Sequence, residues 1–145
     1  ARTHCVGEVS KEAQDLVRVT RECFFEGIKY AKEGNHLFDI SGAIGRYAEE
    51  RGYGVVRDLC GHGIGTALHE APEIPNYEMK RKGVLLKAGM TLAIEPMINI
   101  GGWEVDWMDD DWTVVTRDHS LSAHYENTVL ITENEPKLLS LTEGI

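Results

Sequence analysis

A histidine between glycines and two acidic residues in apolar runs are the residues of this sequence that could do chemistry together. His62 lies within the run Cys-Gly-His-Gly-Ile-Gly, Glu95 follows Thr-Leu-Ala-Ile, and Glu126 precedes Asn-Thr-Val-Leu-Ile. A carboxylate inside an apolar strand is unfavourable unless a cation or hydrogen-bond donors hold it. Because an imidazole and two carboxylates form a mixed nitrogen and oxygen ligand set, they predict a divalent metal site. We expect their ligating atoms to lie within roughly 5 Å of one another.

Each of the three residues also has a purely structural explanation when it is taken alone. His62 could be a turn histidine bonded to the backbone, and Glu95 could be an edge-strand carboxylate that points to water. Pro96 follows Glu95 directly, and a proline in a strand indicates an edge or a bulge, which would redirect the carboxylate. Period-two alternation puts Glu126 on the strand face of His124. The presence of all three favours a metal site over three unrelated structural roles.

Other features are weaker candidates for a site. His69 taken alone is typical of a surface or loop histidine. The glycine run at 61–65 lacks the Gly-Lys-Ser/Thr ending of a phosphate-binding loop. The acidic run at 106–111 lacks the glycine and distal glutamate of a calcium loop, so it predicts a solvated turn. Trp112 fits core packing and a site wall equally well, and Cys60 has no base partner identifiable in the sequence.

The pattern of apolar residues predicts two helices followed by strands. One stripe at helical spacing spans residues 10–34, with Ser10 as the N-cap and Gly34 at the end, and a second spans 37–51. The proline-containing segment 71–75 predicts a loop. Strands are expected at 54–57, 90–100, 112–116, 122–132 and, as a short one, near 138–139. Two helices followed by mostly antiparallel strands give an α+β fold class.

The bulk composition argues against several classes of function. A net charge of −9 disfavours a nucleic-acid-binding surface, because affinity for phosphates comes largely from clustered Lys and Arg. No run approaches the roughly 18 apolar residues of a membrane span, and the first residues lack the apolar core of a signal peptide. The three cysteines have no paired spacing, so reduced thiols and a cytoplasmic location are expected. At 145 residues, the chain has the length of one domain.

Three segments taken together resemble the C-terminal part of a type I methionine aminopeptidase. They are the His62 segment, the strand at 89–99 and the stretch at 111–126, and the resemblance continues to about Leu141. It implies the pita-bread fold, of which this chain would be the C-terminal portion, with two helices followed by a mainly antiparallel curved sheet. It also implies one catalytic domain over 1–145 that is incomplete at its N-terminus.

The resemblance further implies a site with two divalent metal ions in the complete enzyme. His62 and Glu95 would hold one ion and Glu126 would bridge both, while Glu95 would also take part in catalysis. His69 would contact the substrate and take part in catalysis, and Trp112 would line the substrate side. Cobalt, manganese, iron and zinc all suit such a ligand set. In the family, two aspartate ligands and a catalytic histidine precede the matched region, so we expect the chain alone to be inactive.

The implied activity is removal of the N-terminal methionine from nascent polypeptides by metal-activated water. The implied partners are a peptide or nascent-chain N-terminus, a nearby ribosome and the N-terminal portion of the same fold, with no membrane and no specific nucleic acid. Two alternatives stay open: a proline-directed aminopeptidase of the same fold, and a non-catalytic pita-bread binding module. Retention of all three expected ligands disfavours the module. Leu68, His124 and Asn127 depart from the phenylalanine, glutamine and histidine usual in the family.

Overall fold

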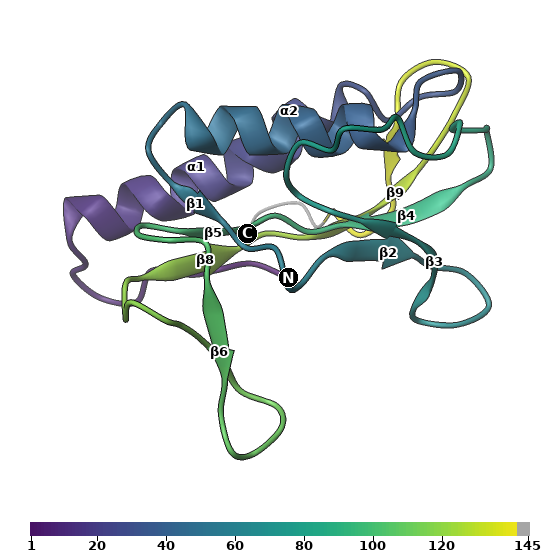
Figure 1. The fold of residues 1–145 in the computed structure, drawn as a ribbon. Coiled ribbons are helices and arrows are strands. Elements are labelled where there is room, and N and C mark those ends of the chain that lie inside the picture. The colour runs from purple at the N-terminus through teal and green to yellow at the C-terminus, as the bar shows by residue number, and fades with distance from the viewer. Residues whose placement is uncertain (142–145) are drawn as a thin grey trace.

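Two helices cover one face of an antiparallel sheet. The computed structural model describes residues 1–141, and Figure 1 shows both helices lying along the same side of the strands. The helices are α1 (Lys11–Ile28) and α2 (Leu37–Glu49). The strands are β1 (Gly54–Val55), β2 (Gly61–Gly63), β3 (Glu70–Ile74), β4 (Thr91–Ile94), β5 (Met97–Asn99), β6 (Val105–Trp107), β7 (Val114–Thr116), β8 (Ser122–His124), β9 (Asn127–Leu130) and β10 (Lys137–Leu138). The expected α+β class and order of elements are present.

Helix α1 begins as predicted and ends earlier than predicted. The Ser10 hydroxyl accepts a hydrogen bond of 3.1 Å from the N–H of Ala13, which satisfies one of the unpaired donors of the first turn. The helix stops at Ile28, six residues before Gly34. The backbone beyond it bonds to distant segments instead, as when the N–H of Glu33 donates to the carbonyl oxygen of Thr132. Tertiary pairing therefore overrides the helical pattern over the last six predicted residues, nearly two turns.

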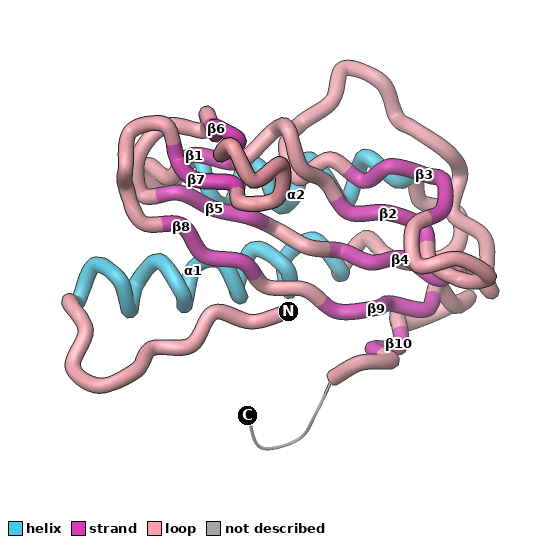
Figure 2. The backbone as a smooth tube through the Cα atoms, turned by 90° about the horizontal axis from the view of Figure 1, so that it is seen from below, coloured by secondary structure: helices cyan, strands magenta, loops and turns pink. Residues whose placement is uncertain are grey.

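The sheet brings two broken strands side by side. β4 and β5 are one run interrupted at Glu95 and Pro96, and β8 and β9 are one run interrupted at Tyr125 and Glu126. β4 pairs with β9 and β5 pairs with β8, both antiparallel, and Figure 2 shows the two runs as neighbours. The N–H of Tyr125 donates to the carbonyl oxygen of Pro96, so the two interruptions face each other. Both glutamates therefore leave the regular ladder at the same level of the sheet.

The strand order places His62 beside the two glutamates. β1, β5 and β8 form a three-stranded sheet in the order β1-β5-β8. In the five-stranded sheet that contains β4 and β9 the order is β10-β9-β4-β2-β3, which places β2 directly beside β4. The predicted loop at 71–75 is wrong, because these residues belong mostly to β3, and the glycine-rich segment forms β2 rather than a turn. Glycine and proline are depleted in strands, so the strand propensities of these residues indicated neither β2 nor β3. A Cβ at Gly61 would collide with the carbonyl oxygen of Ala93, so the close pairing of β2 with β4 requires glycine there.

The apolar core lies between the helices and the sheet. Phe24 of α1 is fully buried, and its ring meets Tyr125 in a T-shaped contact with centroids 5.3 Å apart. Tyr125 directly precedes Glu126, so the core anchors the backbone next to this glutamate. Other buried core residues come from both layers: Leu16, Ile40, Ile44, Leu92, Ile94, Ile98 and Val129. Within residues 1–141, neither helix is long and apolar enough to cross a membrane.

Candidate metal centre

His62 lies on the face of the sheet that points away from the helices. Its register partner on β4 is Ala93, which stands between Leu92 and Ile94, two members of the core beneath the helices. Because side chains alternate along a strand and directly paired residues share a face, Ala93 and His62 face the other way. The His62 side chain is only 12% exposed. The short strand β2 thus presents a single, nearly buried imidazole on this face.

A backbone carbonyl group defines the tautomer of His62. Its Nδ1 lies 2.8 Å from the carbonyl oxygen of Gly63. A carbonyl oxygen can only accept, so Nδ1 carries the proton and Nε2 of the neutral ring presents a lone pair. That Nε2 lies 3.4 Å from Oε1 of Glu95. A backbone partner on one ring nitrogen and a free lone pair on the other is the usual arrangement of a metal-binding histidine.

The two glutamates are placed by the facing interruptions of their strands. Asn76 donates a hydrogen bond of 3.1 Å from its side-chain amide to the carbonyl oxygen of Glu95, which holds the backbone of the break. The Glu95 side chain is 13% exposed, and its Oε2 lies 3.3 Å from Nε2 of His124. The N–H of Glu126 donates a hydrogen bond of 2.8 Å to the carbonyl oxygen of Ala1, which holds the backbone at the second interruption. The Glu95 carboxylate therefore has an imidazole nitrogen close to each of its oxygens.

The three predicted ligands converge as expected. One ligand atom each from His62, Glu95 and Glu126 lies within 4.8 Å of the other two. A shared ion with bonds of about 2 Å separates its ligand atoms by up to about 4 Å, so adjustments below 1 Å bring all three onto one ion. Without a proton or cation between them, the lone pair of Nε2 and the charged Oε1 of Glu95 would repel each other. The donor set therefore fits a divalent cation, and three protein ligands suffice for one ion.

His69 lies beside this group. It ends the loop between β2 and β3, and its ring centroid is 4.3 Å from that of His62. The ring is exposed, so its nitrogen atoms can reach a molecule bound over the sheet. This position agrees with the predicted substrate contact, which remains a prediction. Burial raises the pKa of the Cys60 thiol, with the charge of Glu73 adding to the effect, so Cys60 stays protonated at neutral pH and is a poor ligand or nucleophile.

Trp112 lies on a hairpin that projects from the sheet. β6 and β7 form this hairpin, which is visible below the sheet in Figure 1. Trp112 is 85% exposed in the loop of this hairpin, so it is not packed in the core formed by residues 1–141. The Asp110 carboxylate accepts hydrogen bonds from Trp112 and Thr113, and the Thr113 hydroxyl is the main cause of its lowered pKa. The acidic run is a turn as predicted, except that its first two residues, Asp106 and Trp107, belong to β6.

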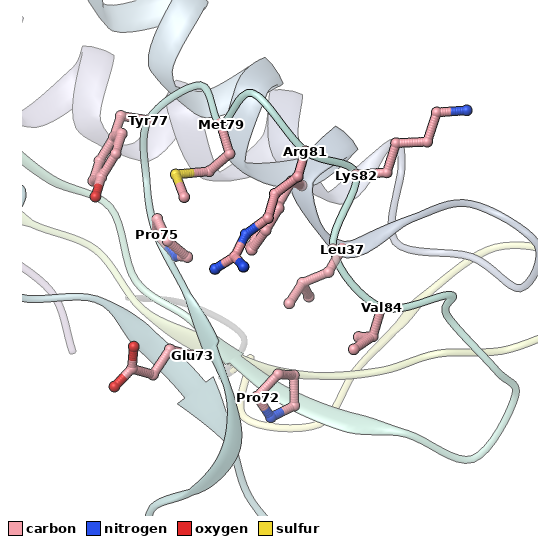
Figure 3. Close-up of a pocket in the computed structure, with 11 residues that line it drawn as sticks. Leu37, Pro72, Glu73, Pro75, Tyr77, Met79, Arg81, Lys82 and Val84 are labelled. Atoms are coloured by element: carbon pink, nitrogen blue, oxygen red, sulfur yellow. The ribbon is translucent and has the colours of Figure 1, made fainter.

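A separate pocket of about 730 Å³ lies between β3 and the segment that follows it. Leu37, Pro72 and Val84 are among the residues of its wall, and Figure 3 shows Arg81 directed into it and Lys82 away from it. None of the three candidate ligands lines this pocket. The metal-ligand group is therefore a feature of the open sheet face and not of this cavity.

Fold and site together define the class of the protein: an α+β protein with a candidate His-Glu-Glu metal-ligand group on the helix-free face of an antiparallel sheet. Residues 1–133 match the model of metallopeptidase family M24, and the chain belongs to that family. Metallopeptidases require metal ions, so a divalent metal belongs to the chemistry of this family.

Curated relatives and solved structures support the same assignment. The chain is 54% identical over 143 residues to methionine aminopeptidase from Clostridium acetobutylicum, and the match covers 99% of this chain and 57% of that protein. For methionine aminopeptidase from Salmonella typhimurium the identity is 47%, with 94% and 52% covered. The chain thus spans about half the length of the curated relatives it matches.

Among solved structures, methionine aminopeptidase from Thermotoga maritima superposes with a TM-score of 0.94 at 48% identity, covering 97% of this chain and 57% of that one. Prolidase from Pyrococcus furiosus gives a TM-score of 0.73 at 29% identity, covering 99% and 36%. These likenesses confirm the expected pita-bread fold.

Proposed function

We propose that the chain carries part of the active site of a metal-dependent methionine aminopeptidase, which removes the N-terminal methionine from polypeptides. The observation that carries this proposal is the convergence of His62, Glu95 and Glu126 within 4.8 Å. The high identity to methionine aminopeptidases over almost the whole chain supports the choice of substrate over that of the prolidase-like relatives. Residues 1–145 then form part of one catalytic domain.

The residues of the site have distinct roles in this proposal. A bound divalent ion supplies Lewis acidity and lowers the pKa of water. His62, Glu95 and Glu126 would hold it, and the Glu95 carboxylate would also accept a proton from the attacking water as a general base. His69, whose ring is tilted against that of His62, donates a ring N–H to the carbonyl oxygen of the substrate. Trp112 on the projecting hairpin covers the methionine side of the bound peptide.

The number of metal ions, their identity and the cellular location of the substrate are also proposed. Three protein ligands hold one ion, so a second ion needs ligands in addition to His62, Glu95 and Glu126. The complete enzyme, which is about twice as long in the relatives, would bind two. The mixed ligand set suits cobalt, manganese, iron or zinc. The substrate would be the N-terminus of a nascent chain, met in the cytoplasm close to the ribosome.

The proposal is tested by measuring metal-dependent release of methionine from a Met-Ala-Ser peptide. We expect turnover by the protein that contains this chain at the length of its relatives, loss of turnover with a chelator, and recovery with cobalt or manganese. Glu126→Gln removes one ligand charge and should lower kcat/KM by at least about 100-fold, in line with the loss of a group that acts on the transition state. An Ala-Pro-Ser peptide should not be cleaved. Equal cleavage of the Ala-Pro-Ser peptide, or turnover without metal, would contradict the proposal.

A further inference from the structure

We infer that His124 is a positioning residue for Glu95. Its Nε2–H holds Oε2 of Glu95 and thereby directs Oε1 toward His62 and the candidate metal position. The inference rests on the proposed metal site and adds to it a residue that does not ligate the metal itself. His124 is also a position where this sequence departs from the glutamine of the resembled family.

The register of the sheet brings His124 to Glu95. His124 ends β8 and is paired with Met97, the first residue of β5, while Glu95 lies in the interruption just before β5. The two side chains meet across this interruption, with Nε2 of His124 3.3 Å from Oε2 of Glu95. The contact is therefore built by two strands that are paired in the ladder, not by a mobile surface chain.

The chemistry of the contact defines which atom carries the proton. Nε2 of His124 is buried and has no hydrogen-bond partner within residues 1–141, so Oε2 of Glu95 is the acceptor within its reach. A carboxylate oxygen only accepts, so Nε2 must carry hydrogen for the contact to be attractive. A shift of a few tenths of an ångström would turn the 3.3 Å approach into an ordinary N–H to oxygen hydrogen bond.

The two oxygens of Glu95 thus meet opposite kinds of nitrogen. Oε1 lies 3.4 Å from Nε2 of His62, which presents a lone pair, and Oε2 lies 3.3 Å from the N–H of His124. The donor on Oε2 stops the carboxylate from rotating, so Oε1 is the oxygen left for a cation. Outer partners of this kind raise metal affinity by about 10-fold to 100-fold.

The backbone of His124 is itself held from the outer edge of the sheet. The hydroxyl of Thr3 accepts a hydrogen bond of 2.9 Å from the N–H of His124 and donates one of 3.1 Å to its carbonyl oxygen. These two bonds lock the backbone of the residue that carries the donor. The His124 side chain is 35% exposed, so replacing it removes little buried volume from the core.

Three variants separate hydrogen-bond donation from a general effect on β8. His124→Leu removes the donor, and His124→Gln keeps one, because the glutamine amide N–H can donate to Oε2 of Glu95. Ser122→Ala is the matched control, since Ser122 lies on the same strand face and bonds to the carbonyl oxygen of Ile98 without touching Glu95. Cobalt and manganese dissociation constants are measured by calorimetry, together with the visible spectrum of bound cobalt and the melting temperature without metal.

We expect His124→Leu to bind cobalt about 10-fold to 100-fold more weakly and to change its spectrum, while His124→Gln and Ser122→Ala stay within about 3-fold of the unchanged protein. Unchanged affinity in His124→Leu, or equal losses in both His124 variants, would overturn the inference. If His124→Leu fails to fold, ¹⁵N NMR of the unchanged protein decides, because an unprotonated Nε2 of His124 would overturn it. Absence of metal binding by the unchanged protein would instead count against the proposed function.

Discussion

Two histidines contact the Glu95 carboxylate in opposite ways, one with a nitrogen lone pair and the other with an N–H group. The carbonyl oxygen of Gly63 takes the Nδ1 proton of His62, so this ring offers Glu95 a lone pair. His124 has no such backbone partner for its buried Nε2, and offers a proton instead. Oε2 of Glu95 therefore faces a donor, while Oε1 and the lone pair of His62 together present a site that suits a cation.

A residue-scale prediction concerns Asp118, at the base of the projecting hairpin. The Ser120 hydroxyl first, then the N–H groups of Ser120 and Gly102, lower the pKa of Asp118 to about 2. The folded state therefore favours the charged form, so the stabilisation is complete above the unfolded pKa near 4 and is lost as the pH falls through about 2. Asp118→Asn should melt below the unchanged protein at pH 6, and the gap should shrink between pH 4 and pH 2. A gap that is independent of pH would contradict this prediction.

At the scale of elements, the short strand β2 connects the fold to the chemistry. It is paired with β4 on one side and β3 on the other, and it carries His62 between two glycines. The glycines permit the close approach of the neighbouring backbones, and the histidine is held at the level of the interruption that carries Glu95. Geometry of the ligand group therefore depends on the spacing of these strands more than on any loop.

Gly61→Ala tests this dependence. The added methyl group meets the carbonyl oxygen of Ala93, a backbone atom, so β2 must move away from β4. We expect a loss of about 1–3 kcal/mol in the free energy of unfolding, measured by urea denaturation, and weaker metal binding. Gly65→Ala is the control: its nearest neighbour is Oε2 of Glu70 at 3.2 Å, the end of a side chain that can move. Equal effects of the two substitutions would show that the strand spacing does not matter.

At the scale of the whole molecule, the helix layer supports the site from behind. Phe24 of α1 packs against Tyr125, and Tyr125 directly precedes Glu126 in the interruption between β8 and β9. The ring contact thus ties the position of one candidate ligand to the packing of the first helix. The site and the core are consequently parts of one cooperative structure.

Removal of the Phe24 ring should therefore lower the stability of the protein and loosen the position of Glu126. Phe24→Ala is expected to lower the free energy of unfolding by about 3–5 kcal/mol, a large share of the about 5–15 kcal/mol typical of a domain. Val6→Ala, at a residue that is 86% exposed, should change it by less than about 0.5 kcal/mol. Chemical denaturation measures both. A loss below 1 kcal/mol for Phe24→Ala would mean that the helix layer is not anchored through this ring.

Local patterns in the sequence were sufficient for several features. Ser10 begins α1, the two helices precede the antiparallel strands, and His62, Glu95 and Glu126 lie close together as predicted. The proline after Glu95 also indicated an interruption of the strand at that point. Such features depend on capping, periodicity and side-chain chemistry, all of which act over a few residues.

Other features were decided only by the tertiary structure. β2 and β3 consist largely of residues with poor strand propensity, and they form because β2 pairs with β4 and β3 pairs with β2. The last six residues predicted for α1 leave the helix, with Glu33 and Gly34 bonding to distant segments, and Trp112 is exposed on a hairpin. The contact of His124 with Glu95 needs the register of β5 with β8. Register joins residues that are far apart in the chain, so no local pattern contains it.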